Sequence, residues 1–178
     1  MSIFSFLGGP PKDETSPETE TIRKITEALD RLEPDYARYL AGFAYILGRV
    51  AHADSHIAPE ETREMERILV QQGGLPEQQA IIVVQMAKTQ NVLFGSTENY
   101  LVTREFTKLA SREQKMALLH CLFAVSSVDD AIETVEDNEI RRIAQEIGLA
   151  HPDFIAVRAI FRQHLSVLRP TSTPDADT

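Results

Sequence analysis

Apolar residues recur at spacings of three and four along most of the chain, the period of a helix with one buried face. One such stripe runs from Leu40 to Val50 and another from Met116 to Phe123, and each leads into a short acidic segment that a further apolar stripe follows. No stretch alternates strictly between apolar and polar residues over a useful length, so no strand is expected. The pattern predicts an all-α domain, a single bundle of about seven or eight helices.

The two acidic segments repeat each other. A shift of 75 residues places Asp54 on Asp129, Glu61 on Glu136 and Glu64 on Glu139. The neighbouring apolar positions keep the same register: Ile57 with Ile132, Met65 with Ile140, and Ile68 with Ile143. Helix, acidic segment and helix therefore occur twice, which predicts a quasi-two-fold internal repeat. The first acidic segment is here residues 54–64 and the second is residues 129–139.

Prolines, glycines and capping residues mark the expected helix boundaries. Pro59 suits the first position of the helix that begins within the first acidic segment, and Ser111 with Gln114 forms a capping box for a later helix. Gly73-Gly74 and Gly148 are natural helix stops. In the first half, helices are expected at 22–32, at 35–51, from Pro59 to the stop at Gly73, and from Pro76 to a connection at 91–96. In the second half, helices are expected at 98–109, from Ser111 to about Val125, from the second acidic segment to Gly148, and from His151 to Leu168.

Two of these helices carry an expected buried stripe. In the helix opened by Pro76 it consists of Ala80, Ile81, Val84 and Ala87. In the last helix it consists of Phe154, Val157, Phe161, Leu165 and Leu168.

The length of 178 residues fits one domain with tails. Residues 1–20 contain Gly, Pro, Ser, Thr and Glu in excess and are expected to be a flexible leader. The helical domain is expected at 21–168, with a disordered polar tail at 169–178. Cys121 is the single cysteine, which excludes an internal disulfide and predicts a small buried apolar residue.

The formal net charge of −9 argues against general binding to nucleic-acid phosphates, which requires clustered Lys and Arg. No apolar run approaches the roughly 20 residues of a membrane-spanning helix. Residues 1–7 are apolar but lack the basic start of a secretory signal, so a cytoplasmic location is expected. An acidic surface favours cations or basic partners.

The acidic segments resemble the signature of the tellurite-resistance TerB-like family, roughly Ala-x-Asp-Gly-x-Ile-x-x-x-Glu-x-x-x-Ile, present once in each half of an all-helical domain. The first copy reads Ala53-Asp54-Ser55-His56-Ile57-Ala58-Pro59-Glu60-Glu61, and the second reads Val128-Asp129-Asp130-Ala131-Ile132-Glu133-Thr134-Val135-Glu136. The glycine after the aspartate is missing from both copies, where Ser55 and Asp130 stand instead. The resemblance covers about residues 20–168 and implies an association with tellurite or related chemical stress.

Carboxylates in such a cluster are oxygen ligands of the kind that Ca²⁺ and Mg²⁺ prefer. Glutamates three residues apart share one helix face, and the aspartates precede their helices closely enough to reach the same end. The candidate cation ligands are Asp54, Glu61, Glu64, Asp129, Asp130, Glu133, Glu136 and Glu139. An EF-hand is excluded, because its twelfth loop position requires a glutamate and those positions hold Met65 and Ile140.

The same carboxylates have a purely structural alternative. Acids in the first turn of a helix are stabilised by its dipole, and a preceding aspartate caps loop N–H groups. The protein is then a module that binds an unknown protein partner. The sequence contains no phosphate-binding loop, no His-Glu-x-x-His and no nucleophile motif, so we expect a protein that is not an enzyme. A metal-dependent hydrolase that uses the paired carboxylates is the weaker third alternative.

Overall fold

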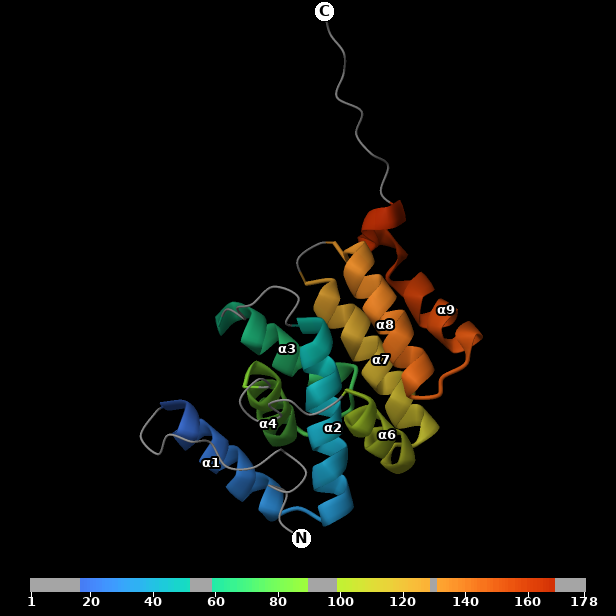
Figure 1. Ribbon diagram of the computed structural model, residues 1–178. Coiled ribbons are helices and arrows are strands. Elements are labelled where there is room, and N and C mark those ends of the chain that lie inside the picture. The colour runs from blue at the N-terminus through green and yellow to red at the C-terminus, as the bar shows by residue number, and fades with distance from the viewer. Residues whose placement is uncertain (1–16, 52–58, 90–98, 129–130, 169–178) are drawn as a thin grey trace, which may run out of the picture.

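Eight α-helices make up most of the described chain. The computed structural model describes residues 17–51, 59–89, 99–128 and 131–168. Its helices are α1 (Pro17–Asp30), α2 (Pro34–Ala51), α3 (Pro59–Gln71), α4 (Glu77–Lys88), α6 (Asn99–Leu109), α7 (Arg112–Ser126), α8 (Thr134–Glu146) and α9 (His151–Ile160), followed by the 3₁₀ helices η3 (Arg162–His164) and η4 (Ser166–Leu168) (Figure 1). These residues contain no strand, only an isolated parallel bridge between Ile132 and Leu165. The predicted all-α bundle is confirmed.

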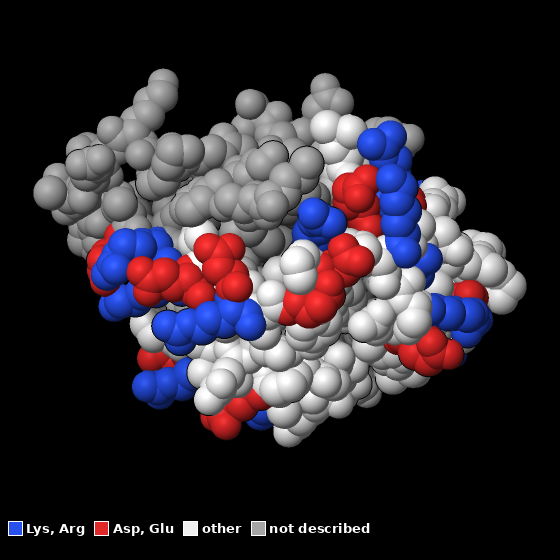
Figure 2. Space-filling model, turned by 90° about the horizontal axis from the view of Figure 1, so that it is seen from below, with Lys and Arg blue, Asp and Glu red and all other residues white. Residues whose placement is uncertain are grey.

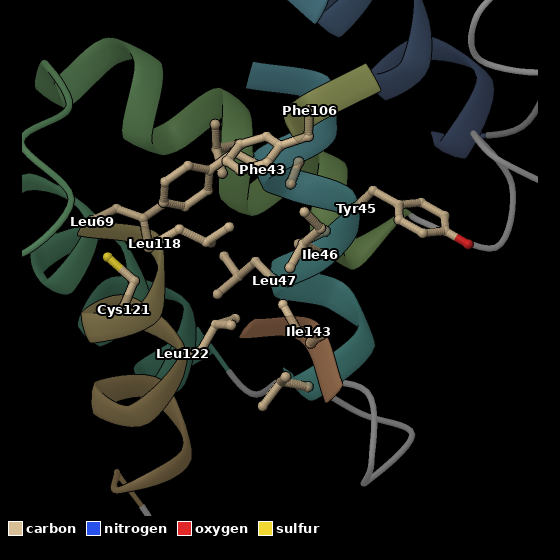
Figure 3. Packing of buried hydrophobic residues seen from close by; sticks show 14 of the residues in the cluster. Phe43, Tyr45, Ile46, Leu47, Leu69, Phe106, Leu118, Cys121, Leu122 and Ile143 are labelled. Carbon is tan, nitrogen blue, oxygen red and sulfur yellow. The ribbon is translucent and has the colours of Figure 1, made fainter. Parts of the chain in front are cut away.

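Helix α2 lies at the centre of the bundle and packs against α1, α4, α6, α7 and α8. Its residues are buried on every side, as expected for a helix enclosed by others. Figure 3 shows Phe43, Ile46 and Leu47 of α2 among side chains that come from α3, α6, α7 and α8. At Gly42 an added Cβ atom would lie 3.0 Å from the Cβ atom of Phe106, so the glycine lets α6 approach α2 closely.

The helices repeat in two halves, residues 34–88 (α2 to α4) and residues 112–160 (α7 to α9). Helix α3 shifted by 75 residues covers the same span as α8. The packing contacts are also equivalent when α2, α3 and α4 are exchanged with α7, α8 and α9. Helix α2 contacts α4 and α8, and correspondingly α7 contacts α9 and α3. Helix α3 contacts α4, and correspondingly α8 contacts α9. The predicted quasi-two-fold repeat is therefore present in the arrangement of six helices.

Two glycines end equivalent helices. Gly74 and Gly148 have φ angles of 65° and 77°, a left-handed conformation that costs other residues free energy. After Gly148 the Leu149 N–H group donates to the Ala144 carbonyl at 2.9 Å, and after Gly74 the Leu75 N–H group donates to Leu69 at 3.2 Å. The first turn spans one more residue, because it has two glycines where the second has one.

The capping signals lie at helix starts as predicted. Pro59 is the first residue of α3. The Ser111 hydroxyl accepts from the Gln114 N–H group at 3.2 Å, and the Gln114 side chain accepts from the Ser111 N–H group at 2.7 Å. This completes the capping box of α7.

Helix α1 starts earlier than the sequence predicted. It begins at Pro17, inside the segment expected to be leader, and Pro is suited to a first helical position. Glutamates that follow at once favour a helix start through the helix dipole. The expected connection at 91–96 and most of the expected leader lie outside the described residues.

The last helix ends earlier than expected, at Ile160. The carbonyl of His164 accepts the Ile132 N–H group at 2.6 Å, and the Ser166 N–H group donates to the Ile132 carbonyl at 3.0 Å. Backbone groups bonded to another segment cannot also continue an α-helix, so the apolar spacing through Leu165 did not mean helix. Leu165 is 1% exposed, whereas Leu168 is 49% exposed and does not belong to the buried stripe.

Helix α4 buries a broader face than predicted. Ala80, Val84 and Ala87 are buried as expected, but Ile81 is 41% exposed and Val83 and Met86 are fully buried. Three helices, α1, α2 and α3, pack around α4, so its buried surface is not one narrow stripe.

One face of the bundle carries interspersed charges of both signs (Figure 2). Short ion pairs within single helices produce such mixing, for example Arg23 with Glu20, Arg38 with Asp35, and Lys108 with Glu105. On this face the visible cations form no continuous stripe of the kind that binds a phosphate backbone.

Candidate functional site

The predicted cation ligands divide into two groups. Asp54, Asp129 and Asp130 lie outside the described residues. The remaining five belong to the described starts of two helices, Glu61 and Glu64 on α3 and Glu133, Glu136 and Glu139 at α8.

Glu136 holds the start of α8. Its Oε2 atom accepts the Glu133 N–H group at 2.8 Å, which is the reciprocal half of a capping box. The interaction forms although residue 133 is neither serine nor threonine, because this half needs only a backbone donor. The carboxylate of Glu136 thus lies at the N-terminal end of α8, beside the backbone of residue 133.

Glu139 binds a buried arginine of the other half. Arg49 of α2 has a side chain only 6% exposed, and its Nε donates to Glu139 Oε1 at 2.9 Å. Its Nη1 donates to Glu146 Oε2 at 2.6 Å. Burial alone would lower the pKa of the Arg49 guanidinium, but the hydrogen bonds and charges of Glu146 and Glu139 outweigh burial and the pKa is raised. Arg142 also approaches Glu139, at 3.3 Å.

Glu64 forms its pair within α3. Arg67, one turn further along the helix, donates from Nε to Glu64 Oε2 at 2.9 Å. The hydrogen bond to Arg67 holds the pKa of the Glu64 carboxyl below its usual value. Both side chains remain accessible to solvent, so this is a surface ion pair.

A pocket of about 430 Å³ lies between the end of α2 and the first turns of α8. It is lined by Arg49, Val50, Val135, Glu136, Asn138, Glu139 and Arg142. Val50 comes shortly before the first acidic segment, and Glu136 belongs to the second. Among the described residues, the pocket thus joins the last turn of α2 to two acids of the second acidic segment, Glu136 and Glu139.

The described residues alone do not make a metal site. Within residues 17–51, 59–89, 99–128 and 131–168, no three His, Cys, Asp or Glu side chains come together in a way that would hold a metal ion. Carboxylate oxygens suit Ca²⁺ and Mg²⁺ chemically, but Glu139 already neutralises Arg49. A cation site here requires the aspartates of the acidic segments, so the predicted ligand set stays a prediction.

The comparison with protein families agrees with the repeat. A model of the family described as tellurite resistance protein TerB matches residues 40–159, more than half of the chain. The chain belongs to the TerB family. Among curated proteins and among solved structures, none matches it.

The TerB match extends from within α2 to the last turn of α9. It includes both halves of the repeat and the pocket between them. Helix α1 and the 3₁₀ helices η3 and η4 lie beyond it. No helix in the described part of this TerB-family chain has the length and apolar character needed to cross a membrane.

Sequence reasoning missed the ion pairs that join separate elements. The first is the Arg49 pair with Glu139 and Glu146. Another joins Asp137 of α8 to Arg158 of α9, whose Nε and Nη2 donate to the carboxylate at 2.9 and 2.7 Å. A third joins Arg112 of α7 to Asp153 of α9 at 2.7 Å. A signal for the first was present, since Arg49 is the single charged residue between Leu40 and Ala51. A cation on so apolar a helix requires a carboxylate partner once it is buried.

The second acidic segment is fixed at Ile132. This side chain is 1% exposed, and both of its backbone groups bond to residues 164 and 166. At the end of α7, the Ser126 Oγ atom is buried and has no hydrogen-bond partner within the described residues. Ile132 thus anchors the second acidic segment to residues 164–166, which follow α9.

Proposed function

We propose that this TerB-family protein is a non-catalytic, stress-associated module that binds a divalent cation, Ca²⁺ or Mg²⁺, at its acidic segments, with the second as the stronger site. The observation that carries the proposal is the pocket between the last turn of α2 and the start of α8, which is lined by Glu136 and Glu139 of the second acidic segment. The association with tellurite or related chemical stress rests on family membership alone.

Chain reach supports the second segment as the main site. Only Ala131 separates Asp130 from Ile132, so the length of the chain keeps their Cα atoms within about 7 Å of each other. Glu136, through its bond to the residue 133 N–H group, is directed to the same end of α8. Asp129, Asp130, Glu133 and Glu136 are the acids we assign to this cation, because mutual repulsion among close carboxylates is relieved by a bound cation.

Arg49 sets a limit on the affinity of that site. Its guanidinium holds Glu139, so a cation that recruits Glu139 must compete with a buried ion pair. We therefore propose that Glu139 helps to position α8, and that the first-segment acids Asp54, Glu61 and Glu64 form a weaker site. Glu64 already has Arg67 as its partner, which reduces the charge available to a cation there.

A second candidate is a protein-interaction module whose acids are structural. It is favoured by a specific observation, since Glu64, Glu136 and Glu139 each have a role in the described structure that requires no metal. In this alternative the helix starts are stabilised by the acids directly.

Thermal unfolding of the chelator-treated protein tests the cation proposal. A cation present at about 100 times its Kd stabilises the folded state by about 2.7 kcal/mol. For a chain of this size such a gain raises the Tm by roughly 5 to 10 °C. We expect this rise with Ca²⁺ or Mg²⁺ in the wild type and its loss in the Asp129→Asn, Glu136→Gln double variant. The Glu136→Gln change retains a side-chain oxygen that can accept the residue 133 N–H group, so the helix cap is not removed.

The matched control is the Asp54→Asn, Glu61→Gln variant, which makes the same changes in the first segment. It should keep most of the cation-dependent rise. Equal Tm values with and without cation in the wild type would contradict the proposal and favour the interaction module. Metal-dependent hydrolysis of a phosphate ester that is lost in the first double variant would instead favour the hydrolase.

A further inference from the structure

A second hollow lies along the end of α9 and the 3₁₀ helices that follow it. It has a volume of about 230 Å³ and is lined by Ile155, Arg158, Ala159, Arg162, Leu165 and Leu168. These six residues are called the α9 groove. The last three of them lie beyond the TerB family match.

The groove exposes apolar surface that the fold does not use. Ile155 is 46% exposed and Leu168 is 49% exposed, while Leu165 at 1% forms part of the core below. Four of the eight exposed large apolar residues in the described part of the chain lie between residues 155 and 168. Exposed apolar surface gathered in this way is typical of a binding surface.

The groove is held in place from two sides. Its floor is fixed by the backbone bonds of Ile132 to residues 164 and 166 on either side of Leu165. One wall is fixed by Arg158, whose guanidinium binds Asp137 of α8. A groove held in this way is preformed and binds with a smaller ordering cost.

The charge of the groove indicates its ligand. Arg158 is committed to Asp137, but Arg162 is exposed and its side chain has no ion pair or hydrogen bond with the described residues. Arg162 is the first residue of η3 and lines the groove together with Ile155 and Leu168, so a cation lies beside the exposed apolar side chains. An apolar hollow with a cation on its wall is complementary to an apolar side chain next to a carboxylate.

We propose that the α9 groove binds an acidic amphipathic helix of a partner protein. Apolar side chains of the partner, three or four residues apart, enter between Ile155 and Leu168, and a carboxylate on the same helix pairs with Arg162. This inference does not rest on the proposed cation binding, because the peptide contacts only α9 and the 3₁₀ helices, although Ile132 and Asp137 of the second acidic segment support the groove from below.

The dimensions and the charge disfavour other ligands. The volume is below the roughly 300 to 1,000 Å³ usual for a small-molecule site, which suits an anchoring side chain. Attachment to an anionic membrane surface usually requires clusters of about four to eight Lys and Arg. Within the described residues the groove has one uncommitted cation, fewer than such a cluster contains.

Binding of designed peptides to the full chain tests the proposal. The probe is a fluorescent helical peptide of about 18 residues with Leu at spacings of three and four and Glu on its flanks, and its counterpart carries Lys in place of Glu. We expect the Glu peptide to bind about tenfold more tightly than the Lys peptide, by anisotropy titration. Arg162→Glu should weaken the Glu peptide about tenfold and improve the Lys peptide, and Ile155→Ser should weaken both about tenfold.

Matched controls are available on the same molecule. Ile160→Ser removes an apolar side chain that is 62% exposed but does not line the groove. Arg63→Glu makes the same charge reversal at an exposed position of α3. Both control variants should bind the Glu peptide as the wild type does, and circular dichroism should show that all four variants are folded.

Several outcomes would overturn the proposal. These are equal binding of the two peptides, absence of binding to the full chain, and equal weakening by the control variants. Self-association in sedimentation that Ile155→Ser abolishes would make a second copy the ligand. Cosedimentation with phosphatidylglycerol vesicles that Arg162→Glu abolishes would make a membrane the ligand.

Discussion

Glu64 and Glu139 occupy the same position of the two halves, yet they make different contacts. Glu64 pairs with Arg67 on its own helix, in contact with solvent. Glu139 pairs with Arg49 on α2, whose side chain is 6% exposed. The difference arises on the facing helix, because the position of α7 equivalent to Arg49 is Ala124. The repeat preserves the arrangement of helices but not the charges placed between them.

A second pair of equivalent positions, Gln71 and Glu146, also differs in charge. Glu146 provides Arg49 with a second carboxylate, whereas its equivalent in the first half, Gln71, is neutral and accepts from Arg67. The acid of the first half thus forms a surface ion pair, whereas the two acids of the second half share the buried Arg49 of α2. Removing carboxylates should have very different consequences in the two halves.

The largest effect is expected from emptying the Arg49 network. The Glu139→Gln, Glu146→Gln variant leaves a buried guanidinium without a counter-charge, so the free energy of unfolding should fall by about 3 kcal/mol. Urea unfolding followed by circular dichroism measures this. Glu64→Gln gives the first half glutamine at both equivalent positions, 64 and 71. It should cause no measurable loss in the free energy of unfolding, because it breaks only a surface ion pair.

A further variant separates lost charge from lost packing. Adding Arg49→Met to the double variant removes the uncompensated cation and should recover most of the lost stability. If Glu64→Gln proves as costly as the double variant, the contrast between buried and surface pairs is wrong.

The glycine turns should behave alike, since they belong to the shared backbone. Gly74→Ala and Gly148→Ala each force a side chain into the left-handed region, where neither added Cβ atom would meet another atom within 4 Å. Each should therefore cost about 1 kcal/mol, from backbone conformation alone. Losses that differ widely in urea unfolding would show that the two turns are not equivalent.

The smallest effects are expected in the pH dependence of stability, at one pair of equivalent positions in the two halves. His120 of α7 is equivalent to Tyr45 of α2. Burial lowers the pKa of His120 below its ordinary value of 6.5, so its contribution to stability is complete above about pH 6.5 and is lost as the pH falls through the folded-state pKa. Burial is the main cause that raises the pKa of Tyr45 above 10.0, so its contribution is present below pH 10 and is lost as the pH rises through the folded-state pKa.

Stability measured across pH checks both directions. His120→Gln should flatten the loss of stability just below pH 6.5 and leave the alkaline side unchanged. Tyr45→Phe should flatten part of the loss above pH 10 and leave the acid side unchanged. Identical pH profiles for the wild type and both variants would contradict these assignments.

The order of helices and their boundaries could be predicted well, because the signals are local. Pro59, Ser111 and Gly148 act through their own backbone or their nearest neighbours, and the register of 75 residues is a property of sequence alone. The end of α9 could not be predicted in this way. Its helical spacing continues to Leu165, and the competing bonds come from Ile132, which lies distant in sequence.

The candidate site was predictable only as a set of acids. Spacing placed Glu136 and Glu139 together on α8, and both are in its first turns. It did not show that Glu136 turns back to the residue 133 N–H group while Glu139 meets Arg49. That division depends on which helix lies opposite, and helix packing is set by the whole core. The α9 groove was missed for the same reason, because Leu165 and Leu168 were assigned to one helical stripe with Phe154 and Val157.

The buried Arg49 has a consequence for dissection of the chain. A fragment limited to the first half retains the guanidinium and loses both of its carboxylates, together with the α6, α7 and α8 surfaces that cover α2. Although the sequence contains an internal repeat, we expect neither half to fold by itself. We expect the two halves to unfold in one cooperative transition, as a single thermodynamic unit.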